Sequence, residues 1–555
     1  MVISNVASMR LYIPDKRDMM TYTLLVTDPI HAIGITYLKS CDDIDLLIRP
    51  NAAIEEIKGL LPEVDAWIVD REQTIDIALL ELAPSLKVIG RAGLRTRYID
   101  IKAATERGIL ILNLPHGMAI SMAEHTFGLM LAAARKIPQA FHDMTSGRLS
   151  PTQYQVHDLY EKRLGLIGFN QVARLLATRA QAFGMTVLVY EPALSEQIAL
   201  DYKIELVDLE DLLPAADIIS LHSDVLDGQE GMVDQVFLSR TKPGVILINT
   251  TSPRLIDADA LADAVKSQQI GAVALDGSLG LSFSTDPTVG LQNAIHTPEM
   301  AILSAEGRER VSIEMAQNIV AALRGGEIRH PVNLAYPDGV PFAQVQAYTE
   351  LARKIGSLQA QLAPAKAYKV EVEVSGDRLQ DMVRPIGAGL LHGLLAGIEP
   401  DSEQRFNQIN APLIASEKGI QITQTYHLKP GGYSNLLTCR VHWYDSQGRD
   451  HSRLISGVLF DEKEPRIVQV DGYRLEAKPD EHVLVMRNKD VPGVIGQVAT
   501  LLATYEVNIA EWRLGRLERG GEALSFINLD GVPPQAVIDA LAQAPAVTSV
   551  DLVFL

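Results

Sequence analysis

Short apolar runs alternate with amphipathic stretches along the first 326 residues of this chain, and this alternation restricts its fold more than any other feature of the sequence. The apolar runs occur at 23–27, 65–70, 86–93, 108–113, 162–169, 185–192, 216–223, 244–251 and 271–278. Because each run is short, rich in β-branched residues and bounded by turn residues, we expect buried strands. Strands that alternate with helices favour parallel βαβ units. The pattern therefore predicts an α/β fold with two doubly wound parallel sheets.

The pattern changes after residues 329–341, which contain proline and glycine and are interpreted as a linker. Residues 342–475 combine a helical start with several strand-like runs, which is typical of an α+β unit. The final segment, 481–555, follows the βαββαβ order of ferredoxin-like units. In the first half, a long helix is expected over 119–144, with an interruption near Pro138.

Composition excludes several classes of function. The 555 residues carry 50 Lys and Arg against 69 Asp and Glu, a formal charge of −19, which argues against a nucleic-acid or anionic-membrane partner. Cys41 and Cys439 are too few for a disulfide framework or a thiolate metal cluster, so no metal site is predicted. No run reaches the roughly 18 apolar residues of a membrane helix, and the N-terminus lacks the apolar core of a secretory signal. We therefore expect a cytoplasmic protein with no membrane partner.

A glycine turn between two strand-like runs is typical of a dinucleotide-binding unit. One strand runs through Gly168 into a helix, and a second strand then ends at Glu191, 191 − 168 = 23 residues after the glycine. In this layout a pyrophosphate rests on the helix N-terminus and the acidic residue binds the ribose hydroxyls. The fingerprint G-x-G-x-x-G reads Gly168, Asn170 and Ala173 here, and a side chain at its second position obstructs the approach of backbone to phosphate. Because Asn tolerates the backbone of such a turn, the sequence predicts a formed turn with weak cofactor affinity.

Specific motifs extend over nearly the whole chain after residue 21. They include GRAG (90–93), MAEHTFGLMLAAAR (122–135), KPGVILINT (242–250), FNQINAPLIASEKGI (406–420) and RNKDVPGVIGQVATLL (487–502). On these motifs the chain resembles the long form of D-3-phosphoglycerate dehydrogenase, within the D-isomer-specific 2-hydroxyacid dehydrogenases. The resemblance implies four units: a substrate-binding domain at 21–115 and 295–330, a dinucleotide-binding domain at 116–294, an allosteric, substrate-binding-like intervening domain at 340–475 and an ACT domain at 481–555.

The resemblance also implies a reaction and the positions that carry it. The family oxidises a phosphorylated 2-hydroxy acid by hydride transfer to NAD, with an Arg that holds the carboxylate, a His that takes the hydroxyl proton and a Glu that tunes the His. At these positions the chain has Ser252, Glu299 and Leu281 respectively. A serine hydroxyl does not replace a guanidinium fork, and a carboxylate is a weaker base than an imidazole. The cofactor-binding positions implied by the resemblance are Gly168, Asn170, Val172, Glu191, His222, Thr250 and Asp276, of which His222 is also open to a purely structural interpretation.

The last unit carries a candidate effector site. The resemblance implies that Asn488, Asp490 and Asn508, paired across two ACT units, bind L-serine. Short polar side chains and backbone N–H groups at a helix N-terminus suit the carboxylate of an amino acid, and an aspartate suits its ammonium group. The alternative is that the Pro-Gly turn at this place only caps a helix.

Two hypotheses of function remain open at this point. The first is a catalytically degenerate member of the family, linked to L-serine biosynthesis, that keeps serine sensing, forms a homo-oligomer and serves as the regulatory partner of an active dehydrogenase. The second is an active NAD-dependent oxidoreductase that acts on 3-phosphoglycerate or another 2-hydroxy acid and uses Arg254 or the turn with Arg95 and Arg97 to hold the anion.

Overall fold

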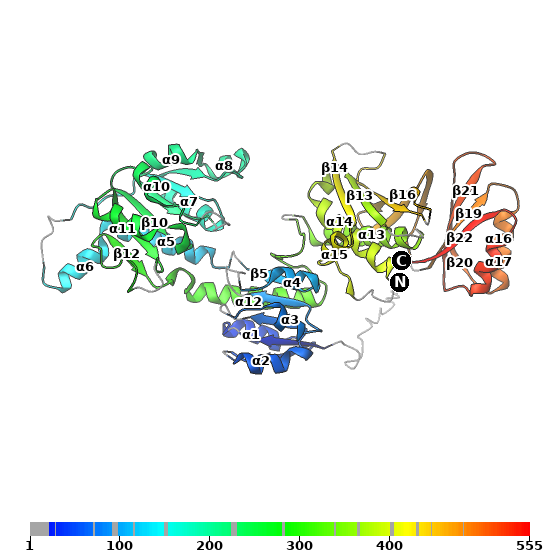
Figure 1. Ribbon diagram of the computed structural model, residues 1–555, viewed down its shortest axis with the longest axis horizontal. Coiled ribbons are helices and arrows are strands. Elements are labelled where there is room, and N and C mark those ends of the chain that lie inside the picture. Colours follow the sequence, from blue (N-terminus) through cyan, green and yellow to red (C-terminus); the bar gives the residue numbers. More distant parts are fainter. Residues whose placement is uncertain are drawn as a thin grey trace, which may run out of the picture.

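The computed structural model describes residues 21–27, 29–50, 52–69, 73–91, 98–114, 117–148, 154–223, 230–279, 284–337, 340–362, 367–399, 405–428, 432–445, 447–480 and 482–555. Four sheets organise these residues, and Figure 1 shows the seven-stranded sheet at one end of the molecule and the four-stranded sheet at the other. Two parallel-sheet units, an α+β unit and a βαββαβ unit follow one another, which confirms the predicted fold class. The exact boundaries between the units stay predictions.

The first sheet has five parallel strands in the order β2-β1-β3-β4-β5. Its elements are β1 (Tyr22–Val26), α1 (Ala32–Lys39), β2 (Ile44–Ile48), α2 (Ile54–Leu60), β3 (Ala66–Val69), α3 (Ile77–Glu81), β4 (Val88–Arg91), α4 (Ile101–Glu106) and β5 (Leu110–Asn113). Successive residues of β1 enter different apolar clusters, Leu24 and Val26 one and Leu25 the other. Both faces of the sheet are therefore covered, which explains why its strands read as continuous apolar runs.

The second sheet has seven parallel strands in the order β12-β11-β10-β9-β6-β7-β8. Its elements are β6 (Arg163–Ile167), α7 (Gln171–Ala182), β7 (Thr186–Tyr190), α8 (Glu196–Tyr202), β8 (Glu205–Leu206), α9 (Leu209–Ala215), β9 (Ile218–Leu221), α10 (Gln235–Arg240), β10 (Val245–Asn249), α11 (Ala258–Lys266), β11 (Ile270–Asp276) and β12 (Ala294–Thr297). The chain enters at β6, winds outward through β7 and β8, and returns to continue from β9 on the other side. This reversal creates a crevice at the carboxyl ends of β6 and β9, where ligands of such sheets bind.

Three helices connect the two parallel sheets: α5 (Ala119–Arg135), α6 (Ile137–Thr145) and α12 (Ala305–Leu323). The predicted interruption of the first long helix is present, and it falls at Lys136, whose φ of 51° is left-handed. A left-handed residue commonly ends a helix. Pro138 lies in the first turn of α6, where its missing N–H would have no helical partner in any case.

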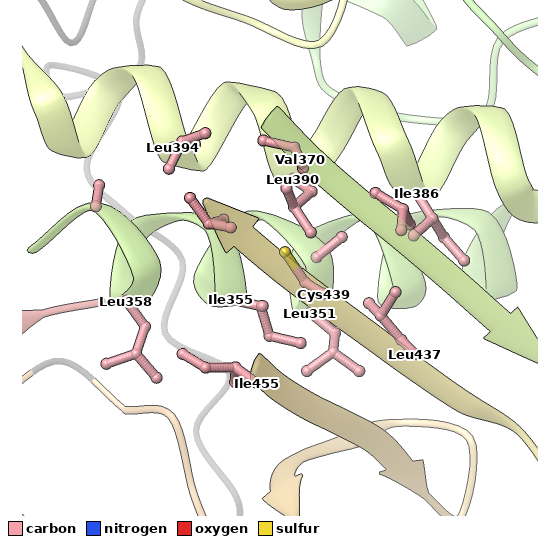
Figure 2. Packing of buried hydrophobic residues seen from close by; sticks show 14 of the residues in the cluster. Leu351, Ile355, Leu358, Val370, Ile386, Leu390, Leu394, Leu437, Cys439 and Ile455 are labelled. Atoms are coloured by element: carbon pink, nitrogen blue, oxygen red, sulfur yellow. The ribbon is translucent and has the colours of Figure 1, made fainter. Parts of the chain in front are cut away.

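The intervening unit (α13 to β18) has a six-stranded sheet in the order β14-β13-β15-β16-β17-β18, antiparallel except for the pair β13–β14. Its elements are α13 (Phe342–Leu362), β13 (Ala367–Ser375), α14 (Val383–Ile398), α15 (Ala411–Glu417), β14 (Gln421–His427), β15 (Leu436–Tyr444), β16 (Asp450–Phe460), β17 (Glu464–Val470) and β18 (Tyr473–Ala477). Figure 2 shows side chains of α13, α14 and three strands meeting in one core around the buried thiol of Cys439. Glycines let the two helices approach closely, since a side chain at Gly393 would overlap a backbone oxygen of α13.

The C-terminal unit (β19 to β22) forms an antiparallel sheet in the order β20-β21-β19-β22, as predicted for a ferredoxin-like unit. Its elements are β19 (His482–Lys489), α16 (Val494–Thr504), β20 (Ile509–Arg516), β21 (Glu522–Leu529), α17 (Gln535–Ala542) and β22 (Val547–Phe554). One face of the sheet packs under α16 and α17. On the other face Val485, Leu524 and Phe526 enter the core of the intervening unit. Among the described residues, no helix is long and apolar enough to cross a membrane.

Candidate functional site

The crevice between β6 and β9 holds the predicted glycine turn. Gly168 directly follows β6, and its φ of +91° lies in the region that favours glycine. A Cβ atom there would lie 2.6 Å from the carbonyl carbon of His222 and from the backbone nitrogen of Ser223, which follow β9. Only a residue without a side chain therefore allows the two strand ends to approach as they do.

Asn170, at the second position of the fingerprint, caps α7 with its own side chain. Its Oδ1 accepts hydrogen bonds from the N–H groups of Val172 (3.0 Å) and Ala173 (3.1 Å). Its Nδ2 donates to the backbone oxygen of His222 at 2.8 Å, which holds the amide across the crevice. Backbone donors at a helix N-terminus are the groups that bind a pyrophosphate. In this structure two of them, those of Val172 and Ala173, already donate to Asn170, so a pyrophosphate bound at this turn would compete with the Asn170 side chain for them.

Glu191, the acidic residue at the end of the next strand, lies beside the same turn. Its carboxylate accepts from the N–H of Phe169 and from the N–H of Ala193, each at 3.4 Å. The spacing in the sequence therefore brings this carboxylate to the glycine turn, as the dinucleotide layout requires.

His222 and Thr250 are both buried, and they directly follow the strands β9 and β10. Nε2 of His222 lies 2.9 Å from the hydroxyl of Ser220, while its Nδ1 has no partner among the described residues. Burial lowers the pKa of His222 to about 3, so the imidazole is neutral. The hydroxyl of Thr250 lies 2.8 Å from that of Thr126 on α5. Neither side chain offers a charge to a ligand, and both interpretations of His222, as a cofactor-binding and as a structural residue, stay predictions.

Ser252, at the position that carries an Arg in the family, uses its side chain to cap a local turn of the backbone. The hydroxyl of Ser252 accepts from the N–H of Arg254 at 3.3 Å and so begins a short 3-10 turn. The Arg254 guanidinium, the candidate substitute, is about half exposed and forms an ion pair with Glu230. The ion pair gives this cation a partner other than an anionic substrate.

Glu299, at the position of the family His, is exposed and has a left-handed φ of 53°. Its N–H donates to the backbone oxygen of Thr297 at 3.0 Å. Leu281 and the turn with Arg95 and Arg97 lie outside the described residues, so the interpretations placed on them stay predictions.

Asp276 and His125 form a polar pair that sequence reasoning did not single out. Nε2 of His125, on α5, lies 3.5 Å from Asp276 Oδ1 and 3.0 Å from the hydroxyl of Thr297. The hydroxyl of Thr297 in turn donates to Asp276 at 2.5 Å. Burial favours protonation of Asp276, but the hydrogen bonds from His125, from Thr297 and from two backbone N–H groups outweigh it and hold the pKa of Asp276 below its ordinary value. An imidazole against an ionised carboxylate is an arrangement that can hold and move a proton.

A sequence signal for this pair existed. His125 lies in the largely apolar helix motif MAEHTFGLMLAAAR, but its partners lie about 150 or more positions further along the chain.

The three predicted effector residues of the C-terminal unit have separate partners. Asn488 is buried and donates to the backbone oxygen of Lys489 at 2.9 Å. Asp490 accepts from Arg516 at 3.1 Å, and Asn508 donates to Asp530 at 2.5 Å. The side chains of Asp490 and Asn508 both lie near the surface. The effector role of the three residues stays a prediction that a ligand titration can test.

Three family models match consecutive parts of the chain. Residues 127–301 match the NAD-binding domain of D-isomer specific 2-hydroxyacid dehydrogenases, residues 344–471 match the D-3-phosphoglycerate dehydrogenase intervening domain, and residues 482–546 match the ACT domain. Together with the parallel sheets and the glycine turn, these matches define a dehydrogenase fold of the D-2-hydroxyacid class that carries an ACT domain.

Curated relatives narrow this class to one family. The chain is 31% identical to the D-3-phosphoglycerate dehydrogenase of Methanocaldococcus jannaschii over 96% of this chain and 99% of the relative. It is 30% identical to that of Bacillus subtilis over 96% and 99%, and 32% identical to that of Archaeoglobus fulgidus over 94% and 97%. The chain therefore belongs to the D-3-phosphoglycerate dehydrogenase family.

Solved structures resemble about half of the chain. The TT0316 protein from Thermus thermophilus is 27% identical, with a TM-score of 0.51 over 56% of this chain and 99% of that protein. A glyoxylate reductase from Paecilomyes thermophila is 23% identical, with a TM-score of 0.52 over 56% and 98%, and it supports the fold alone.

Proposed function

We propose that this chain is a catalytically degenerate member of the D-3-phosphoglycerate dehydrogenase family, linked to L-serine biosynthesis. It binds NAD weakly, senses L-serine through its ACT domain, forms a homo-oligomer and acts as the regulatory partner of an active dehydrogenase. The observation that carries this proposal is the position of the Asn170 side chain, which occupies two N–H donors of α7 and ties them to the opposite strand end.

The altered reaction positions support the same proposal. In this family NAD supplies the hydride acceptor, while the protein must hold a carboxylate and take a proton. Ser252 uses its hydroxyl to cap its own turn, and the nearby guanidinium of Arg254 is paired with Glu230. Glu299 adds negative charge where an anionic substrate would lie, which weakens binding by repulsion. Because such groups act as a unit, losing one already removes most of the rate.

The alternative, an active oxidoreductase, is favoured by one observation. His125 and Asp276 form an acid–base pair at the carboxyl edge of the seven-stranded sheet, and His125 is partly exposed. On this alternative His125 takes the proton and Arg254 leaves Glu230 to hold the substrate carboxylate.

A thermal-shift titration with NADH and L-serine in parallel separates the two candidates. On the leading proposal L-serine raises the melting temperature, NADH at a concentration that stabilises the B. subtilis relative raises it far less, and the response to L-serine is lost in Asp490→Ala. The B. subtilis relative serves as the positive control for NADH. Oxidation of 3-phosphoglycerate with NAD that is abolished by His125→Ala or Arg254→Ala would establish the alternative and remove the leading proposal.

A further inference from the structure

The turn that leads into α15 connects the intervening unit with the first unit. It opens the motif FNQINAPLIASEKGI (406–420), which lies outside the two sites described above. Phe406 is buried in the core of the intervening unit, whereas Ile409 packs against the core of the first unit. α15 accordingly lies beside α4 of the first unit, as Figure 1 shows. This short turn thus contacts two separate hydrophobic cores.

Asn407 makes a polar contact between the same two units. Its Nδ2 donates to the backbone oxygen of Gly108 at 2.8 Å, across 299 positions of the sequence. Its Oδ1 accepts from the N–H groups of Ile409 (2.9 Å) and Asn410 (3.1 Å). An amide side chain suits this place because one end accepts from its own turn while the other end donates to the first unit.

Gly108 provides the matching surface at the end of α4. Its φ of +70° lies in the region that favours glycine, and the residue is buried. A Cβ atom there would overlap Nδ2 of Asn407. Gly419, which follows α15, has a similar φ of +78°, but a Cβ atom there would meet nothing within 4 Å. The glycine at 108 is therefore required by the approach of the intervening unit as well as by the backbone.

The linker is attached to the same segment between α4 and β5. Oδ1 of Asn333 accepts from the N–H of Ile111, and its Nδ2 donates to the backbone oxygen of Ile109, each at 2.8 Å. Leu334 packs against the core of the first unit, while Tyr336 packs against that of the intervening unit. The chain therefore passes from one core to the other within a few residues, close to the turn at 406–410.

We propose that the turn at 406–410 is a docking contact, in which Asn407 and Gly108 hold the intervening and C-terminal units on the first unit as one rigid body. The C-terminal unit belongs to this body because it shares a core with the intervening unit. From Gly108 the chain runs through β5 towards α5, the helix that connects the two parallel sheets. A displacement of the C-terminal unit therefore reaches α5 through β5. The proposal does not depend on whether the dehydrogenase reaction is lost.

Distance measurements between two spin labels on the full chain test the docking contact. Lys102→Cys and Glu417→Cys place the labels at exposed positions next to or on α4 and α15, in a Cys41→Ser background because Cys41 is only partly buried. One narrow distance distribution is expected. In Asn407→Asp the side chain still accepts from its own turn, but an oxygen replaces the donor to Gly108, so the distribution should broaden. A broad distribution without this substitution, or a narrow one with it, would overturn the proposal.

Hydrogen exchange of residues 101–111 makes the test specific to the contact. Asn407→Asp is expected to speed exchange at Gly108 and Ile109 about fivefold or more, since the loss of one hydrogen bond lowers the local stability of the turn. Gln408→Glu is the matched control, because it adds the same charge at a neighbouring side chain that makes no hydrogen bond with the described residues. The control should leave exchange unchanged. Wild-type exchange in folded Asn407→Asp, or equal effects of both variants, would remove the docking role from Asn407.

Discussion

Replacing Asn170 with glycine opens the N-terminus of α7 and is expected to strengthen NADH binding. In the wild-type chain a pyrophosphate must first displace the side chain that accepts the N–H groups of Val172 and Ala173 and donates to the oxygen of His222. In Asn170→Gly the N–H donors are free and the backbone can approach the phosphate closely.

The size of the effect follows from the contacts that the ligand no longer has to break. Loss of an N-cap side chain costs about 1 kcal/mol, and a single neutral hydrogen bond such as that to His222 contributes about 1 kcal/mol. The sum of about 2 kcal/mol corresponds to a roughly 30-fold lower Kd for NADH. The unliganded variant loses only about 1 kcal/mol of stability, since glycine is itself tolerated at an N-cap.

Fluorescence titration with NADH measures the change, with two further variants as comparisons. Asn170→Ser keeps a capping oxygen but loses the donor to His222, so its affinity falls between those of the wild type and the glycine variant. Asp257→Gly removes the cap of α11, where Asp257 accepts from the N–H of Ala260 at 3.0 Å, and it leaves NADH binding unchanged. Equal affinities for NADH in the wild type and in Asn170→Gly would refute the reasoning that the asparagine blocks this helix.

Three further predictions concern stability and reactivity. Hydrogen bonds from Arg324 hold the pKa of Asp43 below its ordinary value, so this pair stabilises the fold above about pH 4, the usual pKa of an aspartate, and the contribution is lost as the pH falls further. Asp43→Asn should therefore lower stability by about 1–2 kcal/mol at pH 7 and by progressively less as the pH falls below about 4, whereas an equal loss at every pH would contradict this. Gly393→Ala forces a side chain against the backbone of α13, and it should lower the melting temperature of the intervening unit by an amount that reflects at least about 2 kcal/mol. Burial raises the pKa of the Cys439 thiol, while Cys41 is only partly buried. A thiol reagent should accordingly label one cysteine per native chain and both in denaturant, and rapid native labelling of two would refute the assignment.

Local patterns in the sequence were sufficient to predict most of this fold. The apolar runs predicted most of the parallel strands because both faces of those sheets are buried, and Pro138 marked the break between α5 and α6 to within two residues. The strands β2, β8 and β12 were missed. All three lie at sheet edges, β2 in the five-stranded sheet and the other two in the seven-stranded sheet, and an edge strand carries less apolar signal of its own.

The sites were less predictable because they depend on contacts between distant elements. The fingerprint identified the glycine turn, but the amide of Asn170 spans the crevice to His222, which is 52 residues away. The same limit applies to His125, whose contact with Thr297 joins residues 172 positions apart. Hydrophobic periodicity reports which face of an element is buried, and it contains no information on which polar groups then meet.

The shared core of the intervening and C-terminal units has a consequence for dissecting this protein. Gln361 of α13 exchanges two hydrogen bonds with the backbone of Phe554 in the last strand, at 2.7 and 3.0 Å, while Phe526 is buried in the same cluster as α13. A chain cut after Asp480 would expose the apolar residues of the intervening unit that pack against Val485, Leu524 and Phe526, and it would be prone to aggregate. The intervening and C-terminal units should therefore be expressed, crystallised and swapped between homologues as one piece of about 210 residues, starting at the linker rather than at the ACT boundary.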